Sequence, residues 1–161
     1  MIDLLRTNSE HPDFQRLVSQ LDAYLAATDG VDHAFYAQYN KIVKIKHVVL
    51  AYSKEDLAGC GAIREFEPGV MEVKRMFTLP AHRGKGIATL ILRELESWSK
   101  ELGAERCILE TGKRMPAAVS LYHNNGYVII PNYGQYAGVE NSCCFEKKLE
   151  FTTLVQTEAS G

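Results

Sequence analysis

The most regular pattern of hydrophobic and polar positions runs through residues 87–102. Apolar residues recur there at spacings of four, four, three and four, at Ile87, Ile91, Leu95, Trp98 and Leu102. Such spacing places them on one face of an α-helix, with polar residues on the opposite face. Gly103 follows directly and is well suited to end the helix. The pattern therefore predicts an amphipathic helix whose apolar face packs on another element.

Shorter apolar runs predict strands on both sides of this helix. Turn-rich SKED and EFEPG separate three of the earlier runs, as in an antiparallel meander. The strands predicted before the helix are Ile2–Arg6, His47–Tyr52, Leu57–Arg64 and Val70–Leu79, and those predicted after it are Arg106–Glu110, Tyr127–Ile130 and Ser142–Leu149.

Three further helices are predicted. The first begins at Ser9 or Asp13 and continues to about Ala27, with an apolar face made of Phe14, Leu17, Leu21, Tyr24 and Leu25. A weaker helical pattern covers Ala34–Tyr39, and a short one covers Pro116–Asn124.

The order of these elements predicts an α/β fold, or an α+β fold with a mixed sheet. A strand followed by a helix and another strand implies a parallel crossover, whereas the meander implies antiparallel pairing. We expect about seven strands and three to four helices. A chain of 161 residues suits one domain. We therefore expect a single domain over residues 1–150 and a flexible tail over residues 151–161.

Composition excludes some classes of partner. The net charge is −2, which gives no general attraction to nucleic acid or to anionic membranes. No apolar run approaches the roughly 20 residues of a membrane span, and the N-terminus lacks the features of a secretory signal. We expect a cytoplasmic protein without nucleic-acid or membrane partners.

Cysteine and histidine spacing gives no sign of a metal site. Cys60, Cys107, Cys143 and Cys144 form no C-x-x-C pair. The five histidines also lack metal-ligand spacing, so no metal is expected. The cysteines are interpreted as small buried thiols in a reducing compartment.

The segment RGKGIA, residues 83–88, lies where a predicted strand gives way to the 87–102 helix. The first turn of a helix leaves N–H groups unpaired, and the helix dipole makes that end positive. Glycines allow a bulky anion to approach the backbone, and Arg83 and Lys85 add charge. The segment therefore favours a phosphate or diphosphate site over a plain glycine turn. It does not fit the Walker pattern, and Thr89 stands where a dinucleotide fingerprint has its third glycine.

Two segments resemble the GNAT superfamily of acetyl-CoA-dependent N-acetyltransferases. Residues 83–88 match its R/Q-x-x-G-x-G/A signature. The segment AAVSLYHNNGY is similar to the family stretch A-x-x-L-Y-x-x-x-G-[FY], with matches at Ala118, Leu121, Tyr122, Gly126 and Tyr127. The resemblance covers about residues 57–149 and implies a mixed sheet splayed into a V that receives acetyl-CoA as cosubstrate.

The resemblance also implies where acetyl-CoA binds. The strand segment Met76, Phe77 and Thr78 would hold the pantetheine arm through its backbone. The turn made of Arg83, Gly84, Lys85, Gly86, Ile87 and Ala88 would hold the diphosphate. One position departs from the family pattern: Met115 stands where many members have an asparagine that contacts the pantetheine.

Acetyl transfer to an amine needs a base for the amine and an acid for the leaving thiolate. Tyr122 lies at the position of the family's usual acid. Glu72 stands 11 residues before Arg83, a spacing at which some members carry a base that acts directly or through water. A core tyrosine and a solvated strand glutamate are the alternatives for these two residues.

Candidate acceptor-binding residues come from the strand before the turn and from the loop 132–141. Arg75 could bind a substrate carboxylate, or could instead pair with Glu140 or another acid. A β-bulge near this residue would disturb the strand alternation. Tyr133, Glu140 and Asn141 belong to a loop rich in Tyr, Gly and Asn, which suits an acceptor pocket.

The resulting prediction is an N-acetyltransferase that acts on the amine of a small molecule, such as an amino acid. A non-catalytic acyl-CoA sensor, an enzyme that acetylates a protein amine and a nucleotide-dependent oxidoreductase are the alternatives. A final strand at a sheet edge also makes a homodimer one open expectation.

Overall fold

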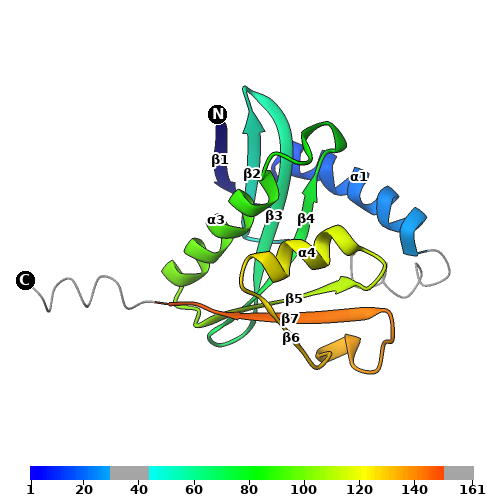
Figure 1. Cartoon of the computed structure of the whole chain (residues 1–161). Coiled ribbons are helices and arrows are strands. Elements are labelled where there is room, and N and C mark those ends of the chain that lie inside the picture. Colours follow the sequence, from blue (N-terminus) through cyan, green and yellow to red (C-terminus); the bar gives the residue numbers. More distant parts are fainter. Residues whose placement is uncertain (30–43, 151–161) are drawn as a thin grey trace, which may run out of the picture. The chain divides into compact units, whose positions relative to one another are not determined.

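A computed structural model describes residues 1–29 and 44–150 of the chain (Figure 1). The helix predicted at Ala34–Tyr39 and the tail predicted at 151–161 lie outside the described residues. The strands are β1 (Ile2–Thr7), β2 (His47–Ser53), β3 (Asp56–Glu67), β4 (Val70–Thr78), β5 (Arg106–Gly112), β6 (Val128–Ile130) and β7 (Ser142–Lys148). The helices are α1 (Pro12–Asp29), α3 (Ile87–Glu101) and α4 (Pro116–Asn124), with 3₁₀ turns η2 (Pro80–His82) and η3 (Gly134–Tyr136).

The strands form one mixed sheet in the order β1-β2-β3-β4-β5-β7-β6. β1 pairs antiparallel with β2, and β2 pairs antiparallel with β3, as the predicted meander requires. β4 pairs parallel with β5 from Val70 opposite Arg106 to Glu72 opposite Ile108. β7 then pairs antiparallel with both β5 and β6. The mixed α/β class and the parallel crossover through α3 are thus confirmed.

The described chain divides into two compact units. The first unit comprises Met1–Arg64 and Val73–Leu95, and the second comprises Glu65–Glu72 and the chain from Glu96 onward. The division crosses β3 between Arg64 and Glu65, β4 between Glu72 and Val73, and α3 between Leu95 and Glu96. Two strands and one helix therefore contribute residues to both units.

In the first unit, α1 packs its apolar side against β2, β3 and β4. Phe14, Leu17, Val18 and Leu21 are buried in one cluster with Val48, Leu50, Cys60, Ala62 and Phe77. Tyr24 was expected on the buried face but is 44% exposed. Val18 is buried instead, so the contact face is rotated relative to the predicted one.

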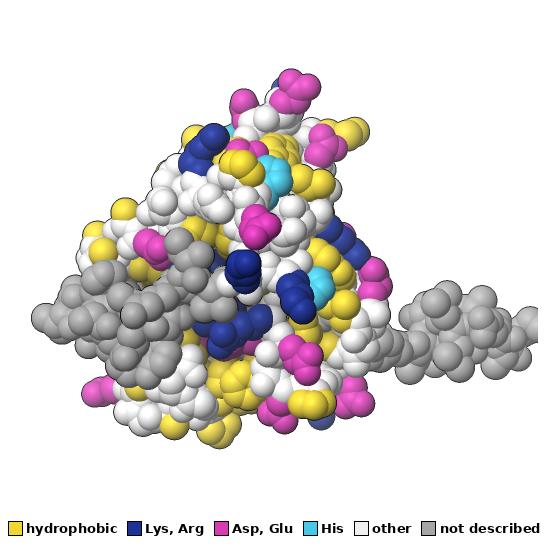
Figure 2. All heavy atoms as spheres, turned by 180° about the vertical axis from the view of Figure 1, so that it is seen from behind, with side chains coloured by type: hydrophobic (Ala, Val, Ile, Leu, Met, Phe, Trp, Pro, Cys, Tyr) yellow, Lys and Arg dark blue, Asp and Glu magenta, His cyan; other side chains and the backbone are white. Residues whose placement is uncertain are grey.

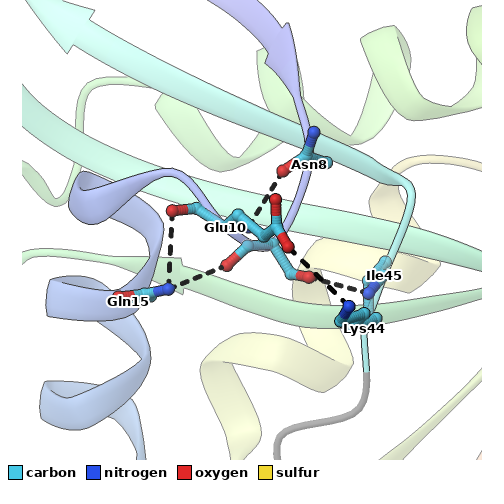
Figure 3. Close-up of polar contacts among 6 residues, drawn as sticks. Asn8, Glu10, Gln15, Lys44 and Ile45 are labelled. Carbon is cyan, nitrogen blue, oxygen red and sulfur yellow. Dashed lines mark hydrogen bonds and ion pairs between the residues drawn. The ribbon is translucent and has the colours of Figure 1, made fainter.

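The loop between β1 and α1 is held by polar contacts (Figure 3). The Ile45 amide donates to Ser9 Oγ at 2.8 Å, and Gln15 Nε2 donates to the carbonyls of Ser9 and Glu10 at 3.5 and 3.4 Å. Ser9 therefore ties the loop to the segment before β2. The helix itself starts at Pro12, because proline suits the first helical position and has no N–H to satisfy.

In the second unit, α4 packs through aromatic residues on β7 and on Tyr127, the residue before β6. The Tyr122 ring lies 5.8 Å from the rings of both Tyr127 and Phe145. Glu96 of α3 accepts hydrogen bonds from Tyr127 Oη and Lys147 Nζ, each at 2.9 Å. The Glu96 contacts hold Tyr127 in place, and the Tyr127 and Phe145 rings hold the Tyr122 ring.

Candidate active site

The turn after β4 has the geometry that an anion site requires. Gly84 and Gly86 have φ values of 77° and 78°, a region that L-residues seldom adopt. A Cβ at either position would meet no protein atom within 4 Å, so the space beside both glycines is open. The Leu90 amide donates to the Gly86 carbonyl at 3.1 Å. The amides of Ile87 and Ala88 lie in the first turn, where a helix provides no acceptor.

One detail of this region differs from the prediction. The strand was expected to reach Leu79 and to give way directly to the helix. Instead β4 ends at Thr78, and the 3₁₀ turn η2 lies between the strand and the glycines. Pro80 accounts for the early end, because proline cannot donate to a sheet ladder.

Arg83 is turned back onto the end of β4. Its Nε donates to the Thr78 carbonyl at 3.0 Å, and its guanidinium lies 5.6 Å from the Tyr24 ring and 5.9 Å from the Phe77 ring. Lys85 is exposed. Arg83 thus holds the strand end in place while its charge stays beside the turn.

Arg75 interrupts the regular geometry of β4. Its φ is 58°, which breaks the alternation of side chains, as the expected bulge would. Its Nη1 forms an ion pair with Asp22 Oδ1 of α1 at 2.7 Å, and its side chain is only 7% exposed. Asp22 is therefore one acid that pairs with Arg75. A role for Arg75 in substrate binding stays a prediction.

Glu72 and Tyr133 meet in the second unit. Glu72 is 1% exposed although its side chain is acidic. The Tyr133 hydroxyl donates a hydrogen bond to Glu72 Oε2 at 2.6 Å. The alternative interpretation of Glu72 as a solvated strand glutamate is therefore wrong, and its role as a base stays a prediction. The structure brings together the candidate base and one of the candidate acceptor-binding residues.

The loop 132–141 holds Tyr133 by several contacts. Asn132 Nδ2 donates to the carbonyls of Val139 and Ser142 at 3.0 and 3.1 Å, which closes the loop on itself. The Tyr133 ring contacts the rings of Phe66 at 5.1 Å and Tyr136 at 5.8 Å, both edge to face. Sequence reasoning missed Phe66, because its EFEPG segment was interpreted only as a turn.

The other two candidates of this loop lie differently. Glu140 is exposed, whereas Asn141 is half-buried and accepts a hydrogen bond from the Lys113 amide through its carbonyl at 2.8 Å. Asn141 therefore anchors the loop to the end of β5. Their acceptor-binding roles stay predictions.

Tyr122 is buried on α4, with 6% of its surface exposed. Burial, and to a lesser extent the negative charge of Glu110, raises the pKa of Tyr122 well above that of free tyrosine. The phenol therefore keeps its proton throughout the neutral range, as a general acid must before its reaction. Met115, the departure from the family pattern, starts α4, and Thr111 Oγ1 lies 3.8 Å from its sulfur.

Three of the four cysteines are buried thiols, as interpreted from the sequence, whereas Cys143 is half-buried. Cys60, Cys107 and Cys144 are buried, and burial raises their pKa to about 12, 11 and 11. Across residues 1–29 and 44–150, no group of three His, Cys, Asp or Glu residues is arranged to hold a metal. None of the helices described has the length and apolar character needed to cross a membrane.

Comparison with known proteins identifies the class to which this fold and site belong. The family model "Acetyltransferase (GNAT) family" matches residues 11–127. The chain belongs to the GNAT family and is an acetyl-CoA-dependent N-acetyltransferase. The oxidoreductase alternative is thereby wrong.

Individual relatives agree with this assignment. The IAA acetyltransferase of Azospirillum brasilense is 31% identical over 137 residues, which cover 83% of this chain and 89% of that protein. The uncharacterized N-acetyltransferase YsnE of Bacillus subtilis is 34% identical over 101 residues, covering 62% of this chain and 67% of the relative.

Solved structures share the fold. A Klebsiella pneumoniae protein assigned to the acyl-CoA N-acyltransferases superposes with a TM-score of 0.78 at 26% identity, over 93% of this chain and 99% of that one. A GNAT acetyltransferase of Elizabethkingia anophelis, solved with acetyl-CoA bound, superposes with a TM-score of 0.66 at 15% identity, over 92% and 98% of the two chains.

Proposed function

We propose that this chain transfers the acetyl group of acetyl-CoA directly to the amine of a small molecule, such as an amino acid. In this proposal Glu72 is the base that receives the amine proton and Tyr122 is the acid that protonates the leaving thiolate. The observation that carries the proposal is the buried carboxylate of Glu72, with the Tyr133 hydroxyl at 2.6 Å.

A buried carboxylate among aromatic rings suits a cationic acceptor. An amine is an ammonium ion at neutral pH and must lose a proton before it can attack a carbonyl. Because the Glu72 carboxylate is buried, its electrostatic attraction for a cation is stronger than that of a carboxylate exposed to water. The Tyr133 and Phe66 rings, which contact each other edge to face, would attract a cation placed over either ring face. These residues therefore support an ammonium site beside Glu72.

The turn after β4 fits the diphosphate of acetyl-CoA. The space beside Gly84 and Gly86 is open, the first-turn amides of α3 lie next to it, and Arg83 and Lys85 supply positive charge. Acetyl-CoA supplies the acetyl group as a reactive thioester. Within the protein, Met76, Phe77 and Thr78 would bind the pantetheine arm through their backbone.

A small acceptor is favoured over a basic protein tail by the surface. On the face drawn in Figure 2, acidic side chains are scattered among apolar and basic ones. A basic tail would be expected to select a continuous acidic surface. The net charge of −2 agrees with this, since it provides little general attraction for a basic chain.

The test is release of free CoA thiol from acetyl-CoA, with the acetylated product identified by mass spectrometry. The acceptor panel contains amino acids, polyamines, aminoglycosides, basic peptides and IAA, the last because it appears in the name of a relative. A blank with enzyme alone corrects for the thiols of the protein, of which Cys143 is half-buried and Cys60, Cys107 and Cys144 are buried.

The outcomes separate the alternatives. Release with a small amine supports the proposal and identifies its acceptor class. Release with basic peptides alone would instead assign the protein-amine alternative. CoA binding without release for any acceptor would favour a sensor of acyl-CoA and would contradict the proposed transfer.

A further inference from the structure

Tyr133 is the more exposed of the two residues joined by its hydrogen bond with Glu72. Glu72 is 1% exposed, whereas Tyr133 is half-buried. The single proton of the hydroxyl points to Glu72 Oε2 at 2.6 Å. A phenolic oxygen also has lone pairs that accept hydrogen bonds. An ammonium group could therefore donate to Tyr133 while Tyr133 donates to Glu72.

Both residues are held in place from several directions. The backbone of Glu72 pairs with β5 opposite Ile108. The ring of Tyr133 is fixed between Phe66 and Tyr136, and its carbonyl accepts a hydrogen bond from the Tyr136 amide at 2.9 Å. Proton transfer along a hydrogen bond needs such fixed geometry, because a small misplacement lengthens the path of the proton.

We propose that Tyr133 relays the proton of the acceptor amine to Glu72. This proposal rests on the proposed function and assigns it a further catalytic residue. The ammonium proton of the acceptor passes to Tyr133 Oη as the original Tyr133 proton passes to Glu72 Oε2. The neutral amine nitrogen then bonds to the acetyl carbon, the carbon–sulfur bond breaks, and Tyr122 protonates the thiolate while water takes the second proton from the nitrogen. Water then returns a proton to Tyr122 and removes one from Glu72.

The surroundings of Tyr133 favour a relay over a free phenolate. The titratable groups that face it are Glu72 on β4, Cys144 on β7 and Tyr136 in its own loop. Burial first, and then the charge of Glu72, raises the pKa of Tyr133 far above that of free tyrosine. A lasting phenolate is therefore costly, and a relay avoids it because one proton leaves as the other arrives.

The test compares Tyr133→Phe and Glu72→Gln with a matched control, Tyr52→Phe. Tyr52 donates to Asp13 Oδ2 at 2.7 Å, so the control removes the same kind of tyrosine–carboxylate bond from the first unit. The rate constant kcat/KM is measured from pH 7 to above the pKa of the free acceptor amine. CoA affinity and the circular dichroism spectrum of each variant are measured in parallel.

We expect Tyr133→Phe to lower kcat/KM at pH 7 by about 100-fold, the usual scale of general base catalysis. The loss should shrink as pH rises through the pKa of the acceptor amine, because the amine then needs no base. Glu72→Gln should behave in the same way, and the double variant should be no worse than either single one. The kcat/KM of Tyr52→Phe should equal that of the wild type at every pH.

Three results would overturn the relay while leaving the proposed function intact. These are a wild-type profile for Tyr133→Phe, a loss that persists above the pKa of the amine, and additive losses in the double variant. If Tyr133→Phe does not fold, the test uses Glu72→Gln alone. Its kcat/KM should recover at high pH, and the solvent isotope effect of the wild type should disappear in it. Absence of turnover by the wild type with every amine would refute the proposed function itself, and the relay with it.

Discussion

Two glycines in β3 lie so close to their neighbours that one added methyl group should destabilise the protein. A Cβ at Gly59 would stand 2.7 Å from the Phe77 carbonyl oxygen. A Cβ at Gly61 would stand 2.6 Å from Met76 Sδ, 2.8 Å from Ile91 Cγ2 and 2.9 Å from Leu95 Cδ1. All of these contacts lie within the first unit. Gly59→Ala and Gly61→Ala therefore test the close approach of β3 to β4 and α3.

The expected cost follows from what must move. Overpacking of a buried site typically costs about 1–3 kcal/mol. Replacing glycine by alanine where φ is ordinary stabilises the protein by about 0.4–1 kcal/mol, because the unfolded chain then has less conformational entropy to lose. The net loss for each variant should be about 1–2 kcal/mol, or roughly 2–8 °C in Tm for a chain of this size. Gly59→Ala should lie at the upper end, because it meets backbone, whereas Met76 at Gly61 can adjust its rotamer.

Thermal unfolding followed by circular dichroism measures the effect, with Gly112→Ala as control. Gly112 also lies in a strand, but its Cβ would meet only Asn141 Nδ2 at an ordinary 3.6 Å. Its Tm should stay close to that of the wild type. Gly59→Ala should also weaken CoA binding, because it displaces the Phe77 carbonyl in the segment expected to bind pantetheine. Wild-type Tm values for both β3 variants would refute the packing argument.

Three further perturbations address the site. Gly86→Asp should abolish CoA binding measured by isothermal titration. The control Gly103→Asp, at a glycine with a φ of 88° and equally open space, should show similar backbone strain but normal CoA binding. Equal CoA binding by the two variants would contradict the diphosphate site. Tyr122→Phe should reduce kcat about 100-fold with little change in CoA affinity and, unlike a base variant, without recovery at high pH; wild-type turnover would remove Tyr122 from the acid role. Arg75→Met should lower the free energy of unfolding, measured by urea titration, by about 1–2 kcal/mol. This is less than the loss of a fully buried ion pair would cost, because Asp22 is 46% exposed. Adding Asp22→Asn to this variant should cause little further loss, and additive losses would argue against the pair.

Local patterns predicted much of the fold. The apolar spacing identified α3 almost to the residue, and Gly103, with its φ of 88°, ends that helix as expected. The short helix Pro116–Asn124 agrees at both ends, because proline starts it and the following Asn-Gly stops it. These signals succeed because periodicity, caps and breakers act within a few residues of chain.

Contacts between distant residues were beyond such patterns. Asp22 lies 53 residues from Arg75, and Tyr133 lies 61 residues from Glu72. A side-chain pattern shows that a carboxylate needs a partner when it is buried, but not which partner the fold supplies. The predicted burial of Tyr24 in α1 failed for a related reason, since neighbouring faces of an amphipathic helix are nearly equivalent until the packing partner is known.

The most informative strand is β4, because its two halves meet different requirements. Its first three residues pair with β5, and the last of them is Glu72. Three residues later, Arg75 adopts a positive φ, which resets the direction of the side chains that follow. A regular strand would fix the orientation of Glu72 and of Met76–Thr78 by one alternation. The irregularity at Arg75 removes that constraint, so the carboxylate can be oriented by Tyr133 while the later backbone is oriented by Arg83 at Thr78. The ion pair between the buried Arg75 and the partly exposed Asp22 is one contact that stabilises this strained residue.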